Sequence, residues 1–168
     1  MNCVNRSLDR AMKWDDLDAQ PCSVARTLAV VGDRWTLMIL RDCFLGVQRF
    51  DDFQHRLGLS RALLADRLKA LTDAGVLERH AYQTRPERFE YRLTPAGIDL
   101  HPIMLGLADW GNRHLADDRG APLLYRHKTC DHDFRPVTTC SHCGEALDAR
   151  SVAVRPGPGF PDPRAARR

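Results

Sequence analysis

Two short pairs of metal-ligand residue types lie near the C-terminal end of the chain. They are His127-Lys-Thr-Cys130 and Cys140-Ser-His-Cys143, an H-x2-C pair and a C-x2-C pair separated by nine residues. Two such pairs on a short hairpin suit tetrahedral zinc, because each turn presents two soft or borderline ligands. Three thiolates and one imidazole, from Cys130, Cys140, Cys143 and His127, therefore predict a closed structural zinc site.

Several alternatives stay open for this cluster. His132 is an alternative fourth ligand, and His142 is a weaker one. Cys140 and Cys143 can instead form an oxidised pair, because C-x2-C thiols can be redox-active. The segment can also be a metal-free lobe in which cysteines are merely clustered.

Composition limits the class of protein that must hold these residues. The chain has 168 residues, 43% of them hydrophobic and 28% charged, which is enough for one packed domain plus an appendage. It contains no apolar run of the length that a transmembrane helix needs, and residues 1–18 lack the apolar segment of a secretory signal. We therefore expect a cytoplasmic protein with no membrane partner, whose six cysteines are metal ligands, a redox thiol or buried hydrophobes rather than a disulfide framework.

The net charge of +3 comes from the C-terminal tail, so the rest of the chain is balanced. Such a weak global charge neither requires nor excludes a nucleic-acid partner. Sequence character divides the chain into four regions: an N-terminal arm (1–20), a globular body (21–118), a Cys/His lobe (119–154), and a Pro/Gly/Arg tail (155–168) that we expect to be disordered.

The body carries strong helix and strand signals. Apolar periodicity and capping residues predict four helices first: one from Pro21 to Gly32, one capped by Asp33 and ending at Gly46, a short one over Phe50–Leu57, and one capped by Ser60 and ending at Ala74-Gly75. Two strands follow, over Val76–Tyr82 and Arg88–Leu93, joined by a Gln83–Glu87 loop. A long helix is then predicted from Thr94-Pro95 to Leu115. The short helix, tight turn and capped helix form a helix-turn-helix, and the hairpin forms a wing. We thus predict a mainly α fold with a small β-hairpin, a winged helix-turn-helix, followed by a small zinc-ribbon-like lobe.

The exposed side of the Ser60 helix and the hairpin tip could bind DNA. Small residues at Ala62 and Ala65 allow close approach to a groove, and Arg61 could read a guanine edge with two hydrogen bonds. Arginines on a proline-stiffened tip suit a minor groove or a phosphate. The predicted DNA-binding residues are Ser60, Arg61, Ala62, Ala65, Asp66, Arg67, Lys69, Arg85 and Arg88.

Several segments together resemble the HxlR-type regulators, winged-helix relatives of the MarR group. They are Cys22-Ser-Val-Ala-Arg-Thr-Leu-Ala-Val-Val-Gly-Asp-Arg-Trp35, Thr36-Leu-Met-Ile-Leu-Arg-Asp-Cys-Phe-Leu-Gly46, Arg49-Phe-Asp-Asp-Phe53, Leu63-Leu-Ala-Asp-Arg-Leu-Lys-Ala-Leu71, Gly75-Val-Leu-Glu78 and Glu90-Tyr-Arg-Leu-Thr-Pro-Ala-Gly97. One departure is Gly32-Asp33-Arg34-Trp35, where the family often has Gly-Gly-Lys-Trp; Asp33 is a better helix cap than glycine. The resemblance implies a homodimeric transcription factor whose first and last helices form the dimer interface and whose partner is a double-stranded DNA operator.

The resemblance also singles out Cys22 as a redox-sensing thiol, because some family members sense oxidants, quinones or aldehydes through a cysteine at this place. A thiolate near a helix N-terminus is stabilised by free amides and the helix dipole. The alternative is that Cys22 is only a small capping or interface residue. Cys43 is expected to be a buried hydrophobe, and Cys3 exposed and incidental.

The leading interpretation is a sequence-specific DNA-binding regulator, an oxidant- or small-molecule-responsive repressor or activator rather than an enzyme. One alternative is a protein-interaction module in which the zinc lobe docks a partner. Another is a thiol or zinc oxidoreductase using Cys140 and Cys143, but the sequence offers no second catalytic constellation, and a site with four protein ligands leaves no open metal position.

Overall fold

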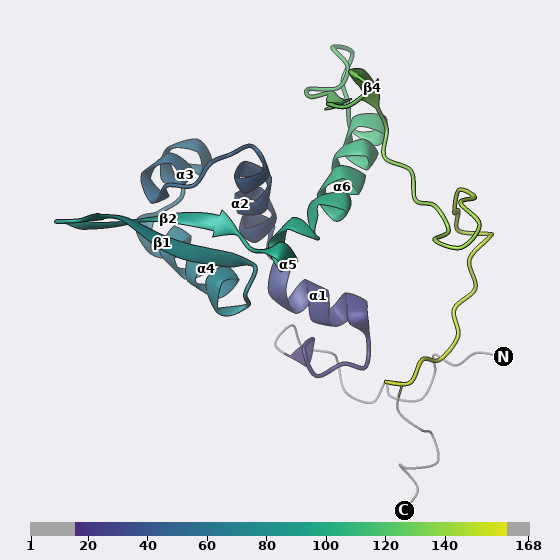
Figure 1. Cartoon of the computed structure of the whole chain (residues 1–168), viewed down its shortest axis with the longest axis horizontal. Coiled ribbons are helices and arrows are strands. Elements are labelled where there is room, and N and C mark those ends of the chain that lie inside the picture. The colour runs from purple at the N-terminus through teal and green to yellow at the C-terminus, as the bar shows by residue number, and fades with distance from the viewer. Residues whose placement is uncertain (1–15, 161–168) are drawn as a thin grey trace, which may run out of the picture. The chain divides into compact units, whose positions relative to one another are not determined.

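The computed structural model describes residues 16–160, which divide into two compact units. The described residues up to Thr94 and those from Pro156 onward form the first unit, and Pro95–Arg155 form the second. The first unit contains α1 (Ser23–Val31), α2 (Arg34–Phe44), α3 (Phe50–Leu57), α4 (Arg61–Asp73), β1 (Leu77–Thr84) and β2 (Glu87–Leu93) (Figure 1). The second contains α5 (Pro95–Ile98), α6 (His101–His114), β3 (Tyr125–His127) and β4 (His132–Phe134). Cys3, most of the predicted N-terminal arm and residues 161–168 of the predicted tail lie outside the described residues.

The core of the first unit is built from one apolar stripe of each helix. Ile39 and Leu40 of α2, Phe53 of α3 and Leu64 of α4 are each at most 1% exposed. In α4 the buried residues Leu64, Leu68 and Leu71 recur at helical spacing, so this helix turns a single face inward. Burying these side chains stabilises the arrangement of α2, α3 and α4 by about 1.5–3 kcal/mol for each large apolar residue.

The turn between α3 and α4 is set by local residue chemistry. Gly58 ends α3 with φ of 65°, a left-handed conformation that glycine adopts at little cost. Leu59 then packs into the core, and the Ser60 hydroxyl accepts a hydrogen bond from the Leu63 amide at 3.3 Å to begin α4. The expected helix-turn-helix is therefore present, and Ser60 caps its second helix.

A buried carboxylate ties α2 to the C-terminal end of α3. Asp42 is fully buried and accepts hydrogen bonds from Arg41 at 2.7 Å and from Arg56 at 3.2 Å. A buried carboxylate is costly unless it is paired, and both guanidinium groups pair with this one. Arg41 belongs to α2 itself, so the contact that fixes α3 against α2 is the one from Arg56.

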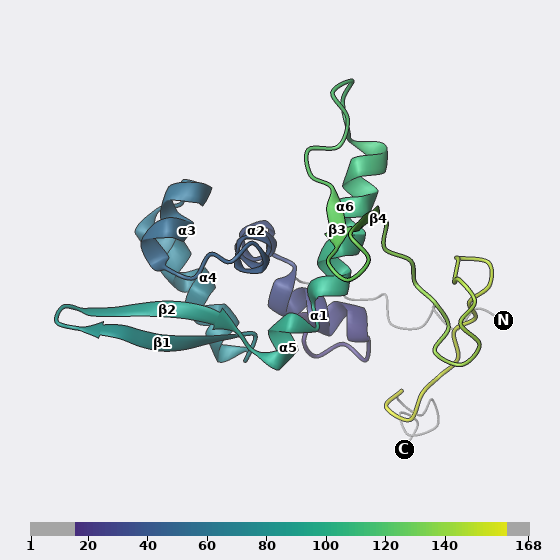
Figure 2. The same cartoon turned by 45° about the horizontal axis from the view of Figure 1, so that its top comes forward.

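The wing is an antiparallel pair anchored at both its base and its flank. β1 and β2 pair from Leu77 with Leu93 out to Thr84 with Glu87, and the register shifts at Tyr82. The connecting loop is shorter than expected: it is only Arg85-Pro86, because the cross-strand ladder continues through Thr84 and Glu87. The amide of Tyr91 donates to the carbonyl of Gln48 at 2.7 Å, which joins β2 to the segment entering α3. The turned view shows the hairpin as a long two-stranded projection of this unit (Figure 2).

The expected long helix from Thr94-Pro95 to Leu115 is wrong as one element, because the structure breaks it into α5 and α6. Pro102 has no amide hydrogen to donate to the carbonyl of Ile98, and its ring crowds the preceding turn. The exposed apolar residues Ile103, Leu107 and Trp110 nevertheless recur at helical spacing along α6.

The second unit groups α5 and α6 with the Cys/His lobe, whereas the sequence suggested a division after residue 118. The lobe is joined to α6 by polar contacts. Arg135 donates to Asp109 at 2.8 Å, and the Asn112 amide donates to the Leu123 carbonyl at 3.1 Å. The β3–β4 hairpin pairs Tyr125 with Phe134.

Candidate nucleic-acid interface

One side of α4 is exposed. Leu64, Leu68 and Leu71 are fully buried, and the opposite side exposes the predicted residues Arg61, Ala62, Ala65, Asp66 and Lys69. Two small side chains near the start of this face leave the helix backbone accessible to a groove floor.

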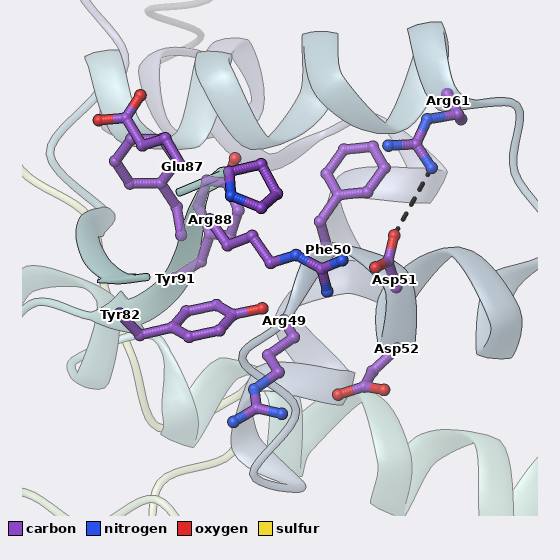
Figure 3. A pocket seen from close by; sticks show the side chains of 11 residues that line it. Arg49, Phe50, Asp51, Asp52, Arg61, Tyr82, Glu87, Arg88 and Tyr91 are labelled. Carbon is purple, nitrogen blue, oxygen red and sulfur yellow. Dashed lines mark ion pairs between the residues drawn. The ribbon is translucent and has the colours of Figure 1, made fainter. Parts of the chain in front are cut away.

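Arg61 is held in place at the N-terminal end of α4. Its guanidinium donates to Gln54 at 3.3 Å, lies 3.5 Å from an oxygen of Asp51, and stacks over the Phe50 ring at 4.9 Å (Figure 3). Its side chain is still 70% exposed. These contacts orient the guanidinium without burying its donors, so they remain available to a base edge.

The wing and the start of α3 enclose a groove of about 560 Å³. Arg61 lines one part of it, and Figure 3 shows Arg88 and Tyr82 reaching into it from the wing. Arg49 stacks over the Tyr82 ring at 4.8 Å and belongs to the same lining. Arginines from α4 and the wing therefore meet at one surface of the first unit.

The wing tip carries two exposed arginines, as predicted. Arg85 and Arg88 flank Pro86 and Glu87, and the Gln83 amide donates to the Arg85 carbonyl at 3.0 Å. Among residues 16–160, no ion pair within 4 Å is found for either guanidinium. Both groups can therefore reach a phosphate without first breaking a salt bridge.

Two predicted DNA-binding residues are engaged within the protein. Arg67 donates to both oxygens of Asp33, at 3.0 and 3.3 Å, so its guanidinium is turned toward the start of α2. Lys69 pairs with Asp73 one turn along α4. The lysine pair is exposed and weak enough to yield to a phosphate, whereas Arg67 serves to hold α4 against α2.

Asp33 combines two roles that the sequence predicted only in part. Its carboxylate caps α2 by accepting from the amides of Trp35 and Thr36, and it also pairs with Arg67. Partial burial opposes its ionisation, but the hydrogen bonds from Arg67, Trp35 and Thr36 outweigh this effect and lower the pKa of Asp33.

Arg49, Gln54 and Asp51 are site residues that the sequence analysis missed. Arg49 forms an isolated β-bridge with Glu90 of β2, so its position beside the wing depends on backbone pairing with a strand distant in sequence. Gln54 and Asp51 lie on α3, facing the start of the next helix. Their polar position on α3 was visible in the sequence, but nothing local indicated Arg61 as their partner.

The thiols differ in environment. Cys22 is exposed at the N-cap of α1, where the sequence placed it, and its side chain makes no capping hydrogen bond. Burial raises the pKa of Cys43 to about 12, and the Asp42 carboxylate adds to the effect. Cys43 therefore remains a protonated thiol at neutral pH. Its side chain is half-buried, so the prediction of a buried hydrophobe is met only in part.

The predicted zinc ligands form two close pairs. The Nδ1 atom of His127 lies 3.2 Å from the Cys130 sulfur, and Cys140 is hydrogen-bonded to the Cys143 side chain. The amides of Cys143 and His142, and then the Cys143 side chain, lower the pKa of Cys140. Within residues 16–160 the structure gathers no set of three or more potential metal ligands, so it brings together each pair but not both.

The described part of the chain contains no helix that is both long and apolar enough to cross a membrane.

Comparison with known proteins gives consistent results. A family model described as HxlR-like helix-turn-helix matches residues 30–119. The HTH-type transcriptional regulator Rv3095 of Mycobacterium tuberculosis, itself described as uncharacterized, is 46% identical over 138 residues, or 82% of this chain and 87% of the relative. That aligned length exceeds the residues up to position 119, so the similarity reaches into the Cys/His lobe.

Solved structures also match. PA1607, a candidate transcription factor, is 31% identical with a TM-score of 0.74, and the match covers 82% of this chain and 96% of that chain. The redox regulator HypR in its oxidized form is 31% identical with a TM-score of 0.52, and the match covers 57% of this chain and 99% of that chain.

Proposed function

Because the chain belongs to the HxlR-like helix-turn-helix family of DNA-binding transcriptional regulators, we propose that it recognises its operator through α4 and the β1–β2 wing. The observation that carries this proposal is the groove that Arg61 of α4 and Arg88 of the wing both line. One element would enter the major groove while the other holds the flanking backbone or minor groove.

In this proposal, base recognition falls mainly to the N-terminal half of α4. Arg61 donates two hydrogen bonds to a guanine edge, and Ala62 and Ala65 let the helix approach closely. Ser60 caps the helix, and Lys69 contacts a phosphate. The Asp66 carboxylate disfavours misaligned positions on the DNA that would bring it close to a negatively charged phosphate. Arg67 is assigned a positioning role instead, because its guanidinium is held by Asp33.

The wing would supply contacts that do not depend strongly on base sequence. Arg85 and Arg88 are exposed at its tip, and the proline between the strands limits the conformations of the loop. Guanidinium groups presented in this way suit a narrow minor groove or adjacent phosphates.

We further propose that the regulator acts as a homodimer on a near-palindromic site. Support comes from unburied apolar faces on α1, with Val24 67% and Leu28 40% exposed, and on α6, with Ile103 and Leu107 each 50% exposed. Apolar residues repeated along one helix face are expected to pack against a partner. A two-fold dimer would pair two α4 helices with successive major grooves.

Cys22 is proposed as a regulatory thiol of this dimer. It is exposed at the start of α1, and the chain is similar to a protein described as a redox regulator. Addition of N-ethylmaleimide to the purified protein should lower operator affinity through a thioether at Cys22, with Cys22→Ser resistant. Equal loss of affinity in that variant would remove Cys22 from the proposal.

The function is tested by fluorescence anisotropy of the reduced protein on DNA from immediately upstream of its own coding sequence. An unrelated duplex of equal length serves as control, and salt is varied. Selective binding that weakens steeply with salt is expected, because phosphate contacts release counterions. Binding that is weak, equal for both duplexes and insensitive to salt would indicate a winged helix used for protein contacts.

A further inference from the structure

The Cys/His lobe lacks the apolar core that would hold it folded. None of the described residues from 98 to 160 is buried. The lobe of residues 119–154 also lies in the size range, below about 40 residues, where a metal, a disulfide or a partner is usually needed for stable folding. A cross-link within the lobe would supply what its side-chain packing does not.

The two ligand pairs sit on turns with the same backbone geometry. In the first, the amide of Asp131 donates to the carbonyl of His127 at 2.8 Å, and Asp131 has φ of 57°. In the second, the amide of Gly144 donates to the carbonyl of Cys140 at 2.8 Å, and Gly144 has φ of 76°. In each turn, the residue after the second ligand donates its amide hydrogen to the carbonyl of the first ligand. This backbone directs both ligand side chains to the same side of the turn.

Asp131 makes this similarity informative. A non-glycine residue with positive φ is uncommon, and Asp131 is the only one found among residues 16–160. The first turn therefore adopts, at some cost, the same backbone as the glycine-containing second turn. Two equivalent turns, one on each side of a nine-residue connection, form a pair of metal-binding knuckles.

The ligand atoms of the first pair lie close to, but slightly nearer than, the separation that a shared metal ion requires. Ligands at the usual zinc distances, 2.3 Å for sulfur and 2.0–2.1 Å for nitrogen, lie about 3.6 Å apart on a tetrahedral edge. His127 Nδ1 and the Cys130 sulfur are 3.2 Å apart. His127 is preferred over His132 as the imidazole ligand because its ring nitrogen already contacts the Cys130 sulfur, whereas the Nδ1 atom of His132 contacts the Cys130 carbonyl.

We propose that Zn²⁺ binds His127, Cys130, Cys140 and Cys143 and joins the two turns into one structural site. Because the structure does not gather both pairs into one group, zinc binding requires the nine-residue connection between Cys130 and Cys140 to bring the two pairs together. Arg135 is tied to Asp109 of α6, and Cys140 lies five positions after it along the chain, a reach of at most ~18 Å. The three thiols give up their protons to solvent as the thiolates coordinate the metal.

The site is tested on the full chain, purified under reducing conditions, by elemental analysis and zinc X-ray absorption. One zinc per chain is expected, with three sulfur ligands and one nitrogen ligand. Cys140→Ser and His127→Ala should lose metal, while Cys43→Ser and His132→Ala should retain it.

A second measurement does not depend on how the variants fold during expression. Co²⁺ added to reduced, metal-stripped parent protein should give the intense visible absorption of a tetrahedral thiolate site, which added Zn²⁺ abolishes. Absence of bound zinc together with absence of this spectrum would overturn the proposal. So would an intact mass lower by two hydrogens and a Cys140–Cys143 disulfide peptide in the reduced preparation.

Discussion

The proposed function assigns to Arg61 the preference of the regulator for one base. Replacing it with alanine should weaken operator binding by about 1–3 kcal/mol and relax preference at a single position. Arg61→Lys is the matched control, because lysine keeps the charge but cannot form the planar two-bond contact. Competition anisotropy with single-base operator variants measures both effects, and an unchanged base preference in Arg61→Ala would reassign recognition to another residue.

Asp33 contributes to stability in two separable ways. Asp33→Ala should lower the free energy of unfolding by about 1 kcal/mol through loss of the α2 cap. Asp33→Asn retains a capping oxygen and loses only the charged pair with Arg67. Urea unfolding of both variants at pH 7 separates the two contributions. If both variants have the same free energy of unfolding as the parent, neither the cap nor the charged pair stabilises the protein.

The pH dependence of Asp33 follows from its lowered pKa. A carboxyl whose pKa is lower in the folded state stabilises the protein above the unfolded pKa of about 3.9, and this stabilisation fades as pH falls through the folded value. The stability difference between the parent and Asp33→Asn should therefore shrink as the pH is lowered below ~4. A stability difference that stays constant over this pH range would mean that packing, and not the charge of Asp33, causes the difference.

At the scale of elements, the wing is expected to add affinity more than specificity. Arg88→Ala should weaken binding to operator and unrelated DNA alike, and should reduce the slope of log affinity against log salt by about one. Arg92→Ala is the control, since Arg92 lies nearer the base of β2 and pairs with Glu90. An Arg88→Ala protein with the salt slope of the parent would mean that the wing tip does not touch phosphate.

The elements that sequence predicts well are those fixed by local chemistry. Ser60 and Asp33 cap their helices as expected, because a cap is decided by residues within one turn. The hairpin loop was predicted too long because the Thr84–Glu87 pairing depends on cross-strand register. The long helix failed at Pro102, where apolar periodicity continued through a residue that cannot donate the helical hydrogen bond.

Site geometry was less predictable than the fold, because it depends on partners distant in sequence. Arg67 has the spacing of an exposed residue, but its partner Asp33 lies 34 positions away. Arg49 stacks over the ring of Tyr82, which lies 33 positions away at the register shift of β1. The winged helix could therefore be derived from the sequence, whereas the division of its arginines between structure and DNA contact could not.

At the scale of the whole molecule, the proposed dimer depends on the apolar face of α6. Leu107→Asp places a charge in that face and should shift the protein from dimer to monomer, with loss of operator binding. Leu124→Asp is a matched control, because Leu124 is 70% exposed and lies outside the helices. Light scattering after size-exclusion chromatography gives the mass directly, and a Leu107→Asp protein that remains dimeric would place the interface elsewhere.

The most direct test of DNA recognition by α4 and the wing is site-specific photo-cross-linking. A benzophenone amino acid is introduced singly at Ala65 of α4, at Arg85 of the wing tip, or at Ala29 of α1, all exposed positions. Irradiation with operator DNA should give strong cross-links from positions 65 and 85 and little from position 29. Cross-linking from position 29 with none from position 65 would contradict the proposal that α4 enters the DNA groove.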